Sequence, residues 1–95
     1  MIINAQMLKL KDRSEGNIAK ARNVLLSMQG KIESLRDLRV EVNIRQGASC
    51  YDLLMIAQYD SLKDLDAYII HPVHVDVAKY IADVLETSAV VCYES

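Results

Sequence analysis

Residues 37–45 read DLRVEVNIR, and this stretch decides the fold class. Apolar side chains alternate with charged or polar ones along its whole length, which is typical of a strand with one buried and one solvated face. The positions expected on the buried face are Leu38, Val40, Val42 and Ile44. Residues 46–49 predict a turn, and residues 51–59 (YDLLMIAQY) are apolar on both faces. We therefore expect an outer strand followed by a central one.

On the N-terminal side, residues 2–10 (IINAQMLKL) are mostly apolar and predict a first strand. Ser14 can cap the helix that follows, because its hydroxyl accepts hydrogen bonds from free N–H groups. One apolar stripe at steps of three and four then predicts an amphipathic helix that frays near Gly30. The stripe consists of Ile18, Ala21, Leu25, Met28, Ile32 and Leu35.

On the C-terminal side, Ser61 opens a second helical segment that Pro72 interrupts. Proline disfavours helical geometry in the residue before it but suits the first position of a helix. We therefore expect a break at residues 70–71 and a new helix from Pro72 to about Leu85. Residues 88–93 (SAVVCY) predict the last strand.

The resulting order, β-α-β-β-α-β, predicts one α+β domain over residues 1–95 with a ferredoxin-like arrangement. In this layout a four-stranded antiparallel sheet has the strand order 4-1-3-2 and carries its helices on one face. The other face is left open, with apolar positions on strands one, three and four. A large exposed apolar face predicts self-association, sheet against sheet.

Composition excludes several classes of protein. With 11 Lys and Arg against 13 Asp and Glu, the chain has no basic excess for nucleic acid or anionic membranes. No apolar run approaches the roughly 20 residues of a transmembrane helix, and no signal peptide is visible. Two cysteines do not make a secreted disulfide framework, so we expect a cytoplasmic protein. No glycine-rich phosphate loop is present, and we expect no cofactor.

His74 is the main candidate for chemistry, because it falls in the first turn of the helix that begins at Pro72. It shares a helix face with Val77, Ala78 and Ile81, so we expect it to point toward the sheet. A neutral imidazole in this place can act as a base or contact a ligand. The alternative is a partly buried histidine that holds the helix break.

Four further polar residues are candidates for the lining of a cavity beside His74. Tyr68 ends the first half of the broken helix. In the alternative interpretation, its ring only packs in the core while its hydroxyl contacts water. Asn4 and Gln6 interrupt an apolar strand, where they line a cavity or form hydrogen bonds across a dimer. His71 completes the set. His71 and His74 are three residues apart, but His71 precedes the proline and no third ligand has zinc-like spacing, so we expect no metal site.

Several segments carry a resemblance to a known family. They are Tyr51-Asp52-Leu53, Tyr59-Asp60-Ser61-Leu62, Leu65-Asp66-Ala67-Tyr68, His71-Pro72-Val73-His74 and Val90-Val91-Cys92-Tyr93-Glu94. As a set, these segments resemble the stress-responsive A/B barrel (Dabb) family, and the resemblance covers nearly the whole chain. It implies a ferredoxin-like protomer and a homodimer whose two sheets face each other as an α/β barrel.

The resemblance also bears on activity. Most members of the family have no assigned activity, and a few plant members are cofactor-free polyketide cyclases. The resemblance to these cyclases implies His74 as base and Tyr68 as its assistant. Asn4 stands where the cyclases have a histidine, and Cys92 stands where they have an aspartate that supports the base.

Three functions follow from the sequence, and it leaves open whether the protein is an enzyme. The first is a homodimer that binds a small apolar or amphipathic molecule between the broken helix and the sheet. In this function Tyr68, His71 and His74 form the polar lining. The second is a cofactor-independent enzyme acting on polyketide-like or aromatic substrates. The third is a non-catalytic assembly or regulatory module whose dimer surface is the function.

Overall fold

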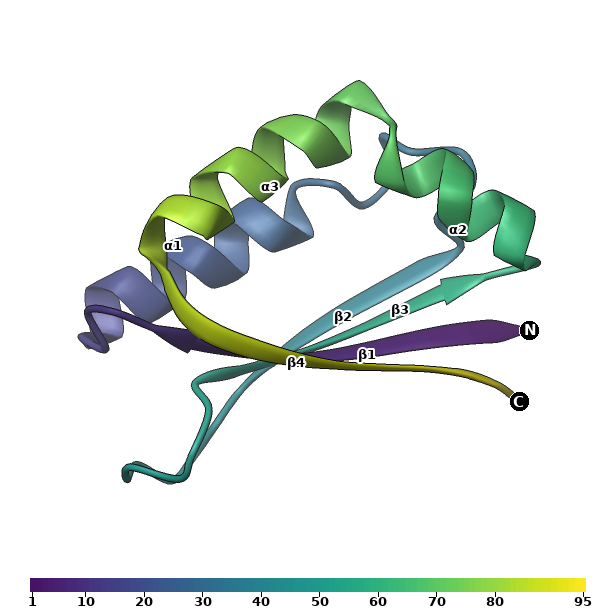
Figure 1. Ribbon diagram of the computed structural model, residues 1–95. Helices are drawn as coiled ribbons and strands as arrows, with labels where there is room; N and C mark the ends of the chain where they lie inside the picture. Colours follow the sequence, from purple (N-terminus) through teal and green to yellow (C-terminus); the bar gives the residue numbers. More distant parts are fainter.

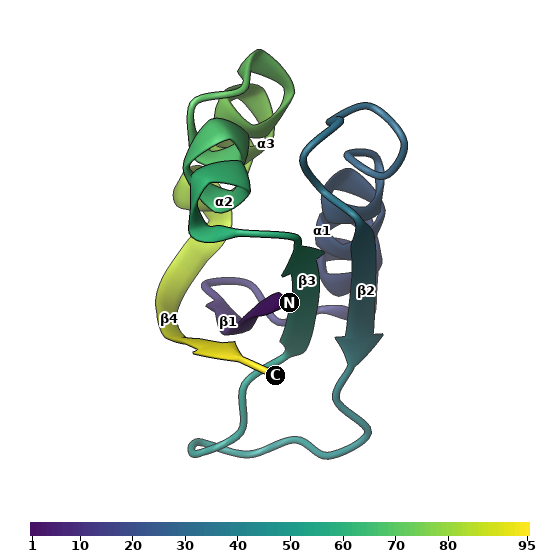
Figure 2. The ribbon, with the colours of Figure 1, turned by 90° about the vertical axis from the view of Figure 1, so that its right-hand side faces the viewer.

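The computed structural model describes residues 1–95 as one antiparallel sheet and three helices. The elements in chain order are β1 (Ile2–Leu10), α1 (Glu15–Leu26), β2 (Asp37–Val42), β3 (Leu53–Tyr59), α2 (Leu62–Ile69), α3 (Pro72–Val84) and β4 (Leu85–Glu94). The strand order β2-β3-β1-β4 confirms the predicted ferredoxin-like topology. All three helices cover one face of the sheet, and the other face stays open (Figure 1, Figure 2).

The register of the strands assigns side chains to the two faces. Asn4 lies between Ala57 and Cys92 in the ladder, so these three side chains share the helix-covered face. The core lies between this face and the helices, and its largest fully buried side chains are Tyr59, Leu8, Leu10, Met28, Leu53 and Val40. On the open face the same alternation places Ile3, Ala5, Met7, Leu54, Ile56, Ala89, Val91 and Tyr93.

The predicted helix starts and the predicted break are confirmed. The Ser14 hydroxyl accepts from the Asn17 N–H at 3.4 Å, and the Ser61 hydroxyl accepts from the Asp64 N–H at 3.2 Å. Each bond satisfies one of the N–H groups that a helix start leaves free. Pro72 is the first residue of α3, and α2 ends at Ile69.

The predicted extent of the first helix is wrong, because α1 ends at Leu26, before Gly30. Gly30 has a φ of +81°, a left-handed conformation that suits glycine, and the chain from residue 27 forms successive turns. Met28, Ile32 and Leu35 are nevertheless buried. The apolar stripe therefore marks burial correctly, although its second half reaches the core from turns instead of a helix.

The hairpin strands are also shorter than predicted, since β2 ends at Val42 and β3 begins at Leu53. The Asn43 side chain donates to the Tyr51 carbonyl at 2.7 Å and accepts from the Arg45 N–H at 2.9 Å. These bonds turn the chain out of the ladder, as asparagine side chains often do. Ile44 is consequently 98% exposed, and Val42 at the end of β2 is 45% exposed, so the predicted place of both on the buried face is wrong.

The last strand begins earlier than predicted, at Leu85 directly after α3. The Lys11 N–H donates to the Val84 carbonyl at 2.9 Å, and Leu10 pairs with Leu85 beyond a β-bulge. The chain thus enters the ladder as soon as the helix ends. None of the three helices has the length and hydrophobicity needed to cross a bilayer.

Candidate functional site

The break between α2 and α3 positions both histidines. In a continuous helix the Ile69 carbonyl would accept from the Val73 N–H. Here the Val73 N–H donates instead to Nδ1 of His71 at 3.1 Å, so His71 caps α3 with its side chain. The Ile69 carbonyl is left without its helical partner.

His74 forms a hydrogen bond with this free carbonyl. Its Nδ1 lies 2.9 Å from the Ile69 oxygen, and this contact fixes the orientation of a half-buried ring. The two histidines therefore act on the same break in different ways: His71 caps the start of α3, and His74 ties α3 back to the end of α2.

Tyr68 lies against His74. The two ring centroids are 4.3 Å apart at a tilt of 42°, and the Tyr68 side chain is buried. The Tyr68 hydroxyl donates to the Met28 sulfur at 3.7 Å, a weak acceptor. Burial raises the pKa of Tyr68 to about 12, so its phenol is uncharged near neutral pH.

Tyr59 is a buried polar group that the sequence reasoning missed. Its ring meets that of Tyr68 edge to face, with centroids 5.2 Å apart, and its hydroxyl has no hydrogen-bond partner in the protein. Burial raises the pKa of Tyr59 far above its ordinary value of 10, and the neighbouring Tyr68 adds to this effect. The one sequence signal was a tyrosine on the helix-facing side of a mostly apolar strand.

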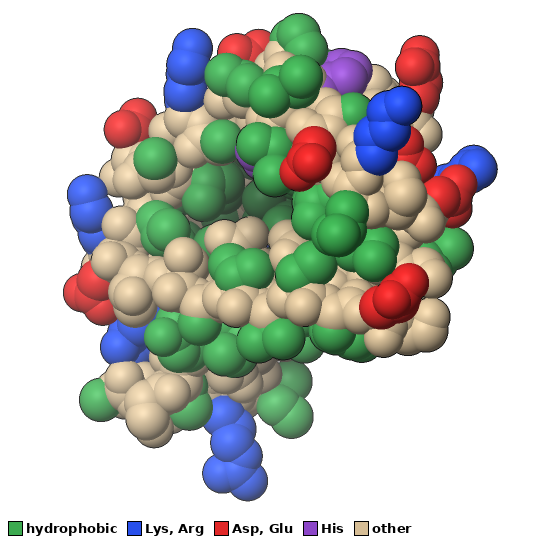
Figure 3. Space-filling model, turned by 45° about the vertical axis from the view of Figure 1, so that its right-hand side comes forward, with side chains coloured by type: hydrophobic (Ala, Val, Ile, Leu, Met, Phe, Trp, Pro, Cys, Tyr) green, Lys and Arg blue, Asp and Glu red, His purple; other side chains and the backbone are tan.

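A cavity of about 410 Å³ lies between the sheet and the helices α2 and α3. Figure 3 shows a hollow with hydrophobic side chains inside it. The only polar side chains besides Tyr68 are those of Asn4, Gln6 and His74, and no Asp, Glu, Lys or Arg takes part. The apolar lining includes Leu25, Met28, Met55, Leu65, Val77, Ile81, Leu85 and Val90.

The structure thus brings together four of the five predicted site residues. Asn4 and Gln6 extend from β1 at the floor of the cavity, while Tyr68 and His74 extend from the helices above it. His71 does not line the cavity, because its side chain is used in the cap of α3. No group of three His, Cys, Asp or Glu side chains is arranged to hold a metal ion.

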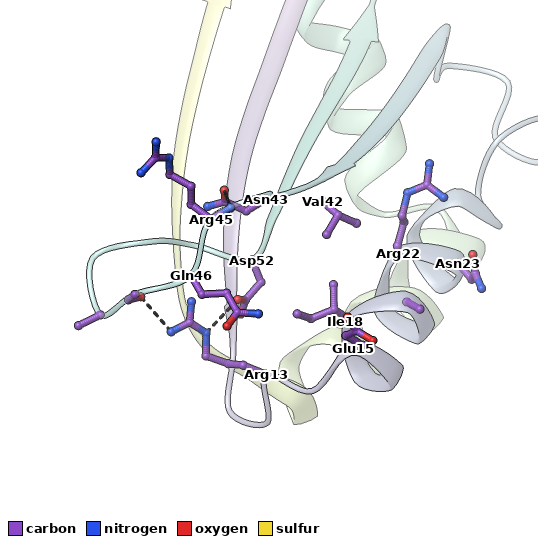
Figure 4. Close-up of a pocket in the computed structure, with 13 residues that line it drawn as sticks. Arg13, Glu15, Ile18, Arg22, Asn23, Val42, Asn43, Arg45, Gln46 and Asp52 are labelled. Atoms are coloured by element: carbon purple, nitrogen blue, oxygen red, sulfur yellow. Dashed lines mark hydrogen bonds and ion pairs between the residues drawn. The ribbon is translucent and has the colours of Figure 1, made fainter.

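A second cleft, of about 560 Å³, lies between α1 and the loop that joins β2 to β3. Figure 4 shows Arg13 directed at Asp52 and at this loop, while Arg22 and Arg45 point away from each other. Arg13 is fully engaged, since it donates to Asp52, to the Gly47 carbonyl and to the Cys50 carbonyl. The arginines here do not converge on an anion site, and Arg13 acts as a structural clamp.

Comparison with families of known proteins identifies the chain. Residues 5–95 match the family described as the stress responsive A/B barrel domain. The chain belongs to the Dabb family. A comparison with curated protein sequences finds no match.

Solved structures with the same fold support this assignment. A Dabb family protein with a ferredoxin-like fold from Mesorhizobium loti is 18% identical over 99% of this chain and 95% of that one, with a TM-score of 0.76. A dimeric protein of unknown function from Bacteroides fragilis is 23% identical over 99% and 95% of the two chains, with a TM-score of 0.82. A hydroxynitrile lyase from Passiflora edulis is 13% identical over 97% and 90%, with a TM-score of 0.83. At these identities the likeness concerns the fold.

Proposed function

We propose that this Dabb protein is a homodimer that binds a small apolar or amphipathic molecule in the cavity between the sheet and helices α2 and α3. The observation that carries the proposal is the composition of the lining. Thirteen of the sixteen lining residues are hydrophobic, and the remaining three offer uncharged or titratable hydrogen-bonding groups. Pockets for small organic molecules commonly combine apolar walls with a few polar groups that set orientation.

The open face of the sheet supports the homodimer. Met7, Val91 and Tyr93 are 43%, 63% and 48% exposed on a face that carries apolar side chains on three strands. Continuous apolar surface of this kind usually marks an interface. Proteins with the same fold from Bacteroides fragilis and Thermobifida fusca are described as dimeric. A second copy of the chain is therefore the proposed cover of this face.

A fluorescent probe tests ligand binding. N-phenyl-1-naphthylamine is uncharged, and its emission rises when it enters an apolar site. Ala82 lines the cavity from α3, and Ala19 lines the second cleft from α1; both are exposed enough to accept a larger side chain. We expect Ala82→Trp to weaken probe binding and Ala19→Trp to leave it unchanged. Equal binding by both variants would place the probe elsewhere and contradict the proposal.

A second candidate function is a cofactor-independent enzyme acting on polyketide-like or aromatic substrates. The observation that favours it is the contact between Tyr68 and His74 at the cavity, which pairs a phenol with a potential base. A hydroxynitrile lyase with this fold supports the idea that the scaffold can carry catalysis. Turnover of a poly-β-ketone by the wild type and by His74→Ala tests it. Equal rates in the two proteins would dismiss His74 as the base.

A further inference from the structure

We infer that the His71-Pro72-Val73-His74 segment holds its two histidines in opposite neutral tautomers, and that the cavity therefore selects uncharged molecules that donate a hydrogen bond, such as phenols, over carboxylates of the same skeleton. The inference rests on the proposed binding function and names the ligand class of that site. It is built on the hydrogen bonds of the helix break and on the charges of the lining.

The tautomer of His74 follows from its partner. A backbone carbonyl oxygen can only accept a hydrogen bond, and Nδ1 of His74 lies 2.9 Å from that of Ile69. Nδ1 must therefore carry the proton. A neutral imidazole has one N–H, so Nε2 of His74 bears a free lone pair, and the structure gives Nε2 no partner.

The tautomer of His71 follows in the same way and is the reverse. The Val73 backbone N–H can only donate, and it donates to Nδ1 of His71 at 3.1 Å. This nitrogen must be unprotonated, and the neutral ring of His71 carries its proton on Nε2. Because His71 does not line the cavity, His74 is the only histidine in its lining.

The lining then defines the ligand. His74 lines the cavity and keeps Nε2 as an acceptor, and the carboxamides of Asn4 and Gln6 in the same lining offer donors and acceptors. No lysine or arginine is present to balance a negative charge, and a lone pair on Nε2 repels a carboxylate oxygen. A hydroxyl group can donate a hydrogen bond to Nε2. Its transfer out of water costs less free energy than the transfer of a carboxylate, which favours phenols and alcohols.

Nitrogen NMR tests the tautomers directly. In a long-range ¹H–¹⁵N spectrum at mildly alkaline pH, protonated and bare ring nitrogens have widely separated shifts. We expect Nδ1–H for His74 and Nε2–H for His71 in one spectrum, with the His74→Phe variant giving the assignment. An Nε2–H pattern for His74 would overturn the inference.

Calorimetry tests the selectivity with 1-naphthol and 1-naphthoate, which share a skeleton. We expect wild type to prefer the naphthol, and His74→Phe to reduce that preference by about 3- to 10-fold, the value of one hydrogen bond. His71→Asn, which keeps a capping side chain, should leave the preference intact. If N-phenyl-1-naphthylamine does not bind the wild type, the proposed function fails. If it binds but the naphthoate binds as well as the naphthol, the ligand class alone is refuted.

Discussion

Asp52 makes the most buried charged contact of the protein, and its replacement is predicted to be strongly destabilising. It is 5% exposed, and its two carboxylate oxygens have separate partners. Oδ2 accepts from the buried Leu10 N–H at 2.9 Å, and Oδ1 accepts from Arg13 Nε at 2.9 Å. Through Arg13 the same carboxylate links the start of α1 to the β2–β3 loop, as Figure 4 shows.

The expected magnitude for Asp52→Ala follows from these two bonds. A buried N–H left without an acceptor costs about 1–3 kcal/mol. The lost ion pair adds roughly 1 kcal/mol, because the Arg13 side chain is 30% exposed and solvent screens its charge. The sum is about 3 kcal/mol, which corresponds to a fall in Tm of roughly 12–24 °C for a domain of this size. Asp52→Asn keeps an acceptor for Leu10 and should lose about a third of this.

The assay is thermal and urea unfolding of both variants at one fixed protein concentration, since the proposed dimerisation would make Tm depend on concentration. Asp60→Ala is the matched control. It breaks the Arg36–Asp60 pair, which is as short at 2.8 Å but lies at the surface, with side chains 60% and 45% exposed. If Asp52→Ala lowers Tm no more than Asp60→Ala does, burial does not decide the strength of these contacts and the reasoning is refuted.

Three further predictions concern the tyrosines and the open face. Tyr59→Phe should leave the free energy of unfolding within about 0.5 kcal/mol of wild type or raise it, because the hydroxyl removed has no protein partner; urea unfolding checks this. Burial raises the pKa of Tyr68 from 10.0 to about 12. The stability that the buried, uncharged phenol contributes is therefore fully present below pH 10.0 and is lost as the pH rises toward 12. The free energy of unfolding should therefore fall less steeply with rising alkaline pH in Tyr68→Phe than in the wild type. Val91→Glu should convert the proposed dimer to monomer in light scattering, whereas Ile70→Glu, at a site 77% exposed on the helix side, should not.

The fold was predictable because its decisive signals are local. The alternation that begins at residue 37 and the proline at position 72 each restrict the backbone within a few residues, and the predicted strand and helix start are confirmed. The end of α1 was not predictable from the stripe, because apolar periodicity reports burial and Met28 is buried from a turn. Ile44 shows the converse limit, since the Asn43 side chain ends the alternation by a contact that no pattern reveals.

The candidate site was predictable in its residues and not in its contacts. Helical spacing alone placed His74 toward the sheet, and polar interruptions of β1 marked Asn4 and Gln6. The partner of His74 is a backbone carbonyl, which every residue carries, so no residue type in the sequence points to it. The unpartnered hydroxyl of Tyr59 was equally hidden, because a tyrosine at a strand end fits a core and a site alike.

The break between α2 and α3 explains the contacts of both histidines. Pro72 has no N–H, and the Val73 N–H is taken by His71, so the end of α2 is left with a free carbonyl at Ile69. The Ile69 carbonyl has lost its helical donor, and Nδ1 of His74 lies 2.9 Å from it and replaces that donor. This bond also orients the imidazole of His74. The backbone of α2 therefore provides His74 with its orienting partner, and no side chain of β4 is needed for this.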